Sequence, residues 1–135
     1  MKRIFGLLAL LFTLGMALPA MADAADSLPA GFIAIAPDEM TWDAAKAYCE
    51  QHGGRLPLIG NSNSLGSVSV SKGTLIDGFG SVGASWPPGL PGVRYWTGTV
   101  NSDFTGYSWG VHGYGDDVGV FSNDPGHAYR VVCVP

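Results

Sequence analysis

The sequence predicts an α+β fold, with one main helix followed by a small antiparallel sheet and long loops. Three observations lead to this prediction. Only one stretch, around residues 42–51, carries apolar side chains at helical spacing. Short apolar segments bounded by Gly, Asn, Asp or Pro follow one another after residue 93, which is typical of strands joined by tight turns. Glycine occupies 20 of the 135 positions and proline nine, and this density favours turns over a helical bundle.

The chain begins with a segment typical of a secretory signal peptide, residues 1–22. Two basic residues precede an uncharged apolar stretch over residues 4–18, and Pro19 and an A-x-A site at residues 20–22 follow it. The apolar stretch is shorter than the roughly 20 residues of a spanning helix, and a retained membrane anchor is the alternative interpretation. We therefore expect cleavage after Ala22, export to the periplasm, cell surface or medium, and a single mature domain, residues 23–135, without a membrane span.

The charge balance restricts the classes of partner. The full chain has 7 Lys and Arg against 11 Asp and Glu, a formal net charge of −4, and removal of the signal peptide takes away two of the basic residues. A nucleic-acid groove needs a surplus of basic side chains on one face. We therefore expect no nucleic-acid partner.

The first strand and the helix are close in the sequence. Residues 31–36 form a short apolar run that Pro37 ends, and this run predicts a strand. Thr41 is placed to cap the following helix, whose acidic first turn favours the positive helix end. Gly53 can take the left-handed conformation that ends the helix. The spacing predicts a core-facing stripe made of Trp42, Ala45, Tyr48 and Cys49.

The rest of the chain predicts loops and then a meander of strands. Small polar residues and a Pro- and Gly-rich stretch dominate residues 60–92, so we expect loops there, with Trp86 exposed. Residues 78–83 match G-x-G-x-x-G, but no helix follows them, so they are interpreted as a flexible loop rather than a dinucleotide site. Strand candidates bounded by turn residues follow at 94–100, 107–112, 117–122 and 127–134.

A second motif suggests catalysis. Residues 106–110 match G-x-S-x-G with Ser108 as the nucleophile, and the acids and the histidine of a triad follow in order, namely Asp116, Asp117 and His127. That chemistry needs the serine on a strained strand-to-helix turn, and residues 111–115 are a poor candidate for the supporting helix. A small serine hydrolase is therefore the alternative, and the expected function has no catalytic residue.

Aromatic and polar residues in turns supply binding candidates. Tyr and Trp in loops form amphipathic contact surfaces for sugars or proteins. The ligand-binding candidates are Trp86, Asn101, Asp103, Tyr107, Trp109 and Tyr114, with core packing as the alternative for the aromatic ones. Turn carboxylates and amides are also hard oxygen ligands of the kind that Ca²⁺ takes. The calcium candidates are Asp116, Asp117, Asn123 and Asp124, with ordinary turn hydrogen bonding as the alternative, and no other cofactor is expected.

The chain has two cysteines, Cys49 and Cys133. In an oxidising compartment one intramolecular disulfide is the simplest pairing. It would close a loop over nearly the whole mature chain, which is worth about 4.5 kcal/mol in the chain-entropy treatment. Two free thiols or an intermolecular bridge are the alternatives.

The segment from Met40 to Cys49 (MTWDAAKAYC), followed by GGRLP, resembles the first helix of C-type lectin-like domains. In that family this helix supplies one half of a long disulfide, and the last strand, similar here to residues 130–134, supplies the other half. Residues 95–100 (YWTGTV) look like the family's central W-x-G strand. The similarity is to compact bacterial members, as found at the tips of adhesins of the intimin and invasin type. The resemblance implies a C-type-lectin-like fold and a Cys49–Cys133 bridge.

The chain also departs from that family. It has no second pair of cysteines and no E-P-N, Q-P-D or W-N-D motif, and only 37 positions separate Trp96 from Cys133, so the long calcium-bearing loop looks deleted. The helix also resembles formylglycine-generating enzymes, which are larger and use reactive cysteines or metal-binding residues. We therefore expect an exported, non-catalytic, adhesin-like module that binds a protein or glycan surface through the loops 60–93, 101–106 and 113–117. A periplasmic or envelope structural protein without a small ligand is the alternative.

Overall fold

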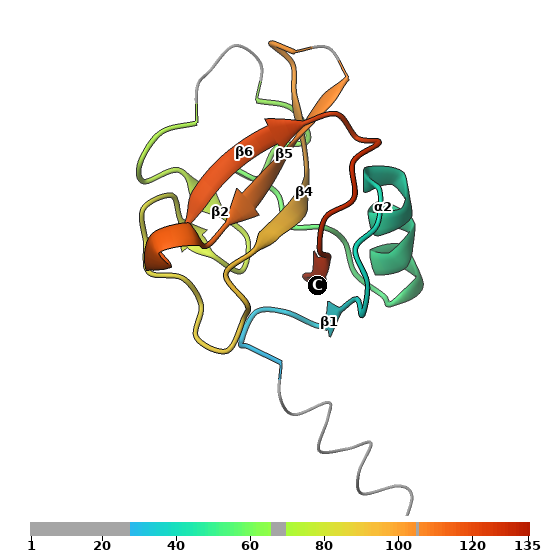
Figure 1. The fold of residues 1–135 in the computed structure, drawn as a ribbon, viewed down its shortest axis with the longest axis horizontal. Helices are drawn as coiled ribbons and strands as arrows, with labels where there is room; N and C mark the ends of the chain where they lie inside the picture. The colour runs from blue at the N-terminus through green and yellow to red at the C-terminus, as the bar shows by residue number, and fades with distance from the viewer. Residues whose placement is uncertain (1–27, 66–69, 105) are drawn as a thin grey trace, which may run out of the picture.

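The computed structural model describes residues 28–65, 70–104 and 106–135, so the expected signal peptide lies outside the described residues. Within these ranges the fold is mixed α and β, with one α-helix and three small antiparallel sheets (Figure 1). The elements in chain order are β1 (Ala34–Ile35), α2 (Trp42–Gln51), β2 (Leu75–Ile76), β3 (Gly80–Ser81), β4 (Arg94–Asn101), β5 (Tyr107–His112), the 3₁₀ turn η1 (Tyr114–Asp116), β6 (Gly119–Asn123) and β7 (Val132–Cys133). In these ranges no helix is long and apolar enough to span a membrane.

The two ends of the described chain pair with each other. β1 runs antiparallel to β7, with Ala34 opposite Cys133. In Figure 1 the C-terminus accordingly lies beside β1, between the central sheet and α2. The central sheet has the order β4-β5-β6, and both of its pairings are antiparallel. The α+β class and the meander order are therefore confirmed.

The helix occupies the residues that the sequence predicts, but its cap differs in one respect. Thr41 takes the extended N-cap backbone, yet its side chain makes no capping hydrogen bond. The Trp42 backbone N–H instead donates to the carbonyl of Pro125, 3.1 Å away, so a distant loop satisfies this helix-end donor. At the other end Gly53 has φ +80°, the left-handed conformation expected after a helix C-terminus.

Two of the four later strand predictions are confirmed and two need correction. β4 extends the predicted 94–100 by one residue, and β5 coincides with 107–112. β6 begins at Gly119 rather than at residue 117, because the Val118 N–H donates to the carbonyl of Ala84 outside the sheet. The predicted strand 127–134 reduces to β7 with isolated bridges before and after it, because Tyr129 and Arg130 pair with different partners.

The interpretation of residues 78–83 as a flexible loop is wrong. β2 and β3 form a short hairpin in which Ile76 lies opposite Gly80. Gly78 has φ +76° at the turn, which a residue with a Cβ rarely adopts. The ring of Phe79 is buried and lies 5.1 Å from that of Phe32. The hairpin is thus fixed to the core by its own turn residue.

The core lies on both faces of the central sheet because consecutive residues of β4 point to opposite sides. Tyr95 and Trp96 are both fully buried, each in a different cluster. The cluster around Tyr95 contains Phe32, Ile59, Ile76, Phe79, Leu90, Val111, Val118, Val132 and Val134. The cluster around Trp96 contains Ala34, Ala36, Ala45, Cys49, Leu56, Tyr129, Val131 and Cys133.

The disulfide joins the helix to the last strand. Cys49 and Cys133 are bonded, with Cα atoms 5.4 Å apart, and both residues are fully buried. The bridge therefore lies inside the cluster around Trp96, between two elements separated by 84 positions. The predicted intramolecular pairing is confirmed.

Candidate functional site

The expectation that Trp86 is exposed is wrong. Its indole is half-buried against the cluster around Tyr95, 5.1 Å from the Phe79 ring, and Nε1 donates to the carbonyl of Leu90 at 2.7 Å. The ring also lies against the backbone of Gly113, where a Cβ would come within 2.6 Å of it. Trp86 is thus a packing residue that pins its Pro-rich loop to the core.

Two further ligand candidates, Trp109 and Asn101, make contacts within the fold. Trp109 is half-buried against the cluster around Tyr95. Asn101 is only 5% exposed, and its amide donates to Ser122 while its side-chain oxygen accepts the backbone N–H of Asp103 at 3.1 Å. Asn101 therefore shapes the turn between β4 and β5, and Asp103 stands exposed on that turn.

An open groove of about 490 Å³ lies beside this turn. It lies between the start of α2, the end of β4 and the start of β5. The Trp42 indole is fixed there because its Nε1 donates to the Thr97 carbonyl at 2.8 Å. The groove is lined by Trp42, Asp43, Val100, Asn101, Ser102, Gly106, Tyr107, Ser108 and Pro125. Three residues singled out in the sequence, Asn101, Tyr107 and Ser108, therefore meet at one place.

A pair of aromatic rings stands beside this groove. Phe104 and Tyr107 stack with ring centroids 5.7 Å apart, and they are 60% and 37% exposed. The backbone N–H of Tyr107 donates to the carbonyl of Phe104, which holds the two residues in one turn. Phe104 is not among the candidates found in the sequence, although a Phe between two predicted strands among polar turn residues is a detectable signal.

The geometry required of a nucleophilic Ser108 is not found. Ser108 lies inside β5, paired with Val100 of β4 and Asn123 of β6, and is 1% exposed. The strand continues to His112 and is followed by the short turn η1 rather than by a helix. A nucleophile elbow places its serine on a sharp strand-to-helix turn, so Ser108 has the place of a buried strand residue.

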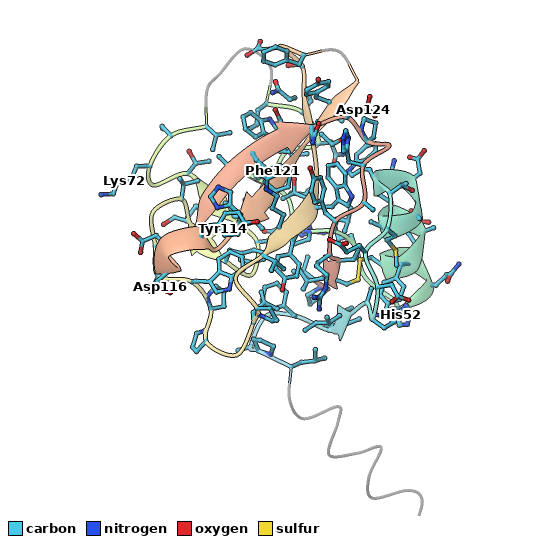
Figure 2. The ribbon with its side chains drawn as sticks, viewed as in Figure 1. His52, Lys72, Tyr114, Asp116, Phe121 and Asp124 are labelled. Atoms are coloured by element: carbon cyan, nitrogen blue, oxygen red, sulfur yellow. A yellow bond between two sulfur atoms is a disulfide. The ribbon has the colours of Figure 1, made fainter. Side chains whose placement is uncertain are left out.

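The four calcium candidates do not come together. Asp116 and Asp117 precede β6, whereas Asn123 and Asp124 end and follow it, and Figure 2 shows Asp116 and Asp124 at opposite ends of this strand. The six steps of extended chain from Asp117 to Asn123 span about 20 Å, far beyond a shared coordination sphere. The Asn123 amide donates to the Tyr129 hydroxyl at 2.6 Å. No group of three or more His, Cys, Asp or Glu that could hold a metal occurs among the described residues.

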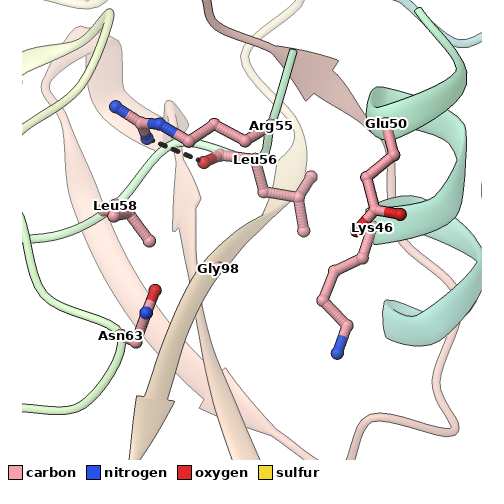
Figure 3. Close-up of a pocket in the computed structure, with 7 residues that line it drawn as sticks. All are labelled: Lys46, Glu50, Arg55, Leu56, Leu58, Asn63 and Gly98. Carbon is pink, nitrogen blue, oxygen red and sulfur yellow. Dashed lines mark hydrogen bonds between the residues drawn. The ribbon is translucent and has the colours of Figure 1, made fainter. Parts of the chain in front are cut away.

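A smaller pocket of about 140 Å³ lies farther along the helix (Figure 3). Lys46 and Glu50 face it from α2, and Arg55 and Asn63 close it from the following segment. The Arg55 guanidinium donates to Asp77 at 2.7 Å, and the Lys46 ammonium lies over the Trp42 ring, 3.6 Å from its centroid. Both cations already have partners, so the charge that this pocket offers to a ligand is the carboxylate of Glu50.

A third surface gathers rings around one arginine. The guanidinium carbon of Arg94, at the start of β4, lies 5.0 Å from the Phe121 ring centroid, 5.9 Å from that of Tyr129 and 6.0 Å from that of Tyr114. Figure 2 shows Tyr114 and Phe121 near each other over the ribbon of the central sheet. Tyr114, a ligand candidate from the sequence, is 58% exposed. We call Arg94, His112, Tyr114, Phe121 and Tyr129 the Arg94 face.

His112 connects the members of this surface. It lies opposite Arg94 across β4 and β5, and its ring is 5.0 Å from that of Tyr114. Burial lowers the pKa of His112 below its ordinary value of 6.5, and the positive charge of Arg94 lowers it further. Near pH 7 the imidazole is therefore neutral, and the permanent charge of this surface belongs to Arg94.

Comparison of the chain with protein-family models, with curated proteins and with solved structures found no match.

Proposed function

We propose that the chain is an exported, non-catalytic binding module whose groove beside the β4–β5 turn takes a glycan. The observation that carries this proposal is the exposed ring pair of Phe104 and Tyr107 beside the groove. Exposed aromatic rings on a shaped turn bury large area at low cost in conformational entropy, so they are typical contact residues.

The composition of the groove favours a sugar over an apolar ligand. Its lining contains both aromatic rings, Trp42 and Tyr107, and the polar side chains of Asp43 and Ser102. A sugar ring presents C–H groups on its faces and hydroxyls at its edge, so it needs both kinds of contact. A few convergent polar groups beside aromatic walls are common in sites for small ligands.

We also propose that the architecture is C-type-lectin-like. Support comes from the pairing of β1 with β7, the helix that follows β1, and the disulfide between that helix and β7. Export is supported by the same disulfide, because such bridges persist in oxidising compartments and are rare in the cytosol.

The test is a binding screen of the mature domain, residues 23–135, against an array of immobilised glycans, with and without calcium. We expect saturable binding that falls at least tenfold in Phe104→Ala and in Tyr107→Ala. Leu75→Ala is the matched control, because Leu75 is an exposed apolar side chain (62%) on another element. Calcium is not expected to change the affinity.

Three outcomes overturn the proposal. Binding that is unaffected by both ring substitutions removes the groove as the site. Binding to a target that survives enzymatic deglycosylation identifies a protein partner instead. Absence of binding to any glycan on the array favours the structural role in the envelope.

A further inference from the structure

The Arg94 face is separate from the groove. Arg94 begins β4 and Asn101 ends it, so seven steps along the strand, about 23 Å, separate the two places. The groove residues lie at the β4–β5 turn, whereas the Arg94 face lies at the end where β5 runs into η1. Any ligand of the Arg94 face therefore meets a different set of side chains.

Two glycines let the rings of this face lie close to the strands. Gly110 is opposite Phe121 across β5 and β6, and a Cβ at Gly110 would collide with the Phe121 ring and approach the Tyr95 carbonyl oxygen to 2.6 Å. Gly119 is opposite His112, and a Cβ there would come within 2.7 Å of the imidazole Nε2. The bare strand positions thus seat both rings, and both side chains stay partly exposed. The result is an aromatic platform fixed by backbone.

The charge on this platform has no acidic counterpart in the part of the chain that the structure describes. The ion pairs found there join Lys46 to Asp43 and Arg55 to Asp77, and neither includes Arg94. Contact with aromatic rings stabilises the cation without consuming its five N–H donors.

The available donors match a carboxylate. Guanidinium donors form a fixed fork that binds a carboxylate through two parallel hydrogen bonds, which gives both strength and orientation. The rings of Tyr114 and Phe121 beside the fork offer an apolar surface to a flat ligand. A sugar ring that bears a carboxylate combines the two features that this surface would recognise.

We propose that the Arg94 face binds the carboxylate of an acidic sugar, a uronic or a sialic acid, with the sugar ring packed against Tyr114 and Phe121. The inference rests on the proposed glycan function, because it names the class of sugar. It uses none of the groove residues, however, so the two proposals fail separately.

The test compares each acidic sugar with a neutral match by calorimetric titration of the mature domain. Trigalacturonate is paired with its methyl ester, which keeps the rings and loses the charges, and sialyllactose is paired with lactose. We expect at least one acidic member to bind at least tenfold more tightly than its neutral match. The two pairs distinguish a uronic acid from a sialic acid.

Substitutions assign the binding to this face. Arg94→Gln is expected to weaken binding of the acidic sugar 10- to 100-fold, the range for loss of a charged bidentate hydrogen bond. Arg94→Lys should retain only part of the wild-type affinity, because an ammonium lacks the paired donors of a guanidinium. Tyr114→Ala tests the ring contact and should cost about fivefold. Lys72→Gln, at an exposed cation on another loop, is the matched control and should leave binding unchanged.

Equal affinity for the acidic and neutral members overturns the inference, as does undiminished binding in Arg94→Gln or a failure of both acidic sugars to bind. If neutral glycans bind and that binding depends on Phe104 but not on Arg94, the proposed function stands and the inference falls. Circular dichroism of each variant verifies that the fold is intact.

Discussion

Reduction of the Cys49–Cys133 bridge should remove a large part of the stability of this domain. The bridge joins residues 84 positions apart and so constrains most of the unfolded chain. In the chain-entropy treatment, closing a loop of this length lowers the entropy of the unfolded state by about 15 cal/mol/K, or about 4.6 kcal/mol at 25 °C. Domains of this size have a total free energy of unfolding of about 5–15 kcal/mol. The reduced protein should therefore be marginally stable at best.

The assay is urea denaturation of the mature domain with and without reductant. We expect the free energy of unfolding to fall by about 4–5 kcal/mol and the denaturant dependence to rise, because the reduced unfolded chain exposes more surface. The double substitution of Cys49→Ala and Cys133→Ala is the control, because the difference between it and the reduced wild type isolates the loss of sulfur packing. A difference below about 1 kcal/mol between oxidised and reduced wild type would refute the loop-closure argument.

Three further outcomes test the packing. Trp86→Ala should lower the free energy of unfolding, measured by urea denaturation, by about 3 kcal/mol, because the indole packs on the core. A decrease below about 0.5 kcal/mol would show that the ring is exposed. Gly110→Ala should lower the free energy of unfolding by about 1–3 kcal/mol, since a Cβ there collides with the Phe121 ring. Gly98→Ala should lower it less, because the nearest atom to a Cβ there is the end of the flexible Leu58 side chain, 3.0 Å away. Because the pKa of His112 is lowered in the folded protein, the His112 imidazole binds a proton more readily in the unfolded chain. The free energy of unfolding should therefore decline as pH falls through 6.5, and it should decline less in His112→Gln. Parallel pH profiles of the two proteins would contradict this.

The helix and the two longest strands could be predicted because their signals are local. The spacing of Ala45 and Cys49 on one face of a helix, and the turn residues around β4 and β5, are visible within a dozen residues. The later strands could not be bounded in the same way. Tyr129 pairs with Met40, whereas Arg130 pairs with Tyr95, so the segment forms bridges to two distant partners instead of one ladder.

The candidate site was predicted less well, because exposure depends on distant contacts. Proline and glycine around Trp86 indicate a surface loop, but the indole packs against the backbone of Gly113, 27 positions later in the chain. In the same way, the turn residues Asp117 and Asn123 are near in sequence, but an extended strand separates them. Tyr107 was found because it borders a predicted turn, and the turn itself is part of the groove.

The glycines of the central sheet explain why the Arg94 face escaped the sequence analysis. High glycine content was interpreted as a sign of turns, which holds for Gly53 and Gly78 with their positive φ values. Gly110 and Gly119, by contrast, have ordinary strand conformations and serve as bare positions beneath the rings of the residues opposite them. Gly110 and Phe121 are 11 positions apart, so their relation appears only once the register of β5 and β6 is known. A glycine opposite an aromatic residue in an antiparallel pair is thus a packing signal in its own right, because the missing Cβ leaves room for the ring of the residue opposite it.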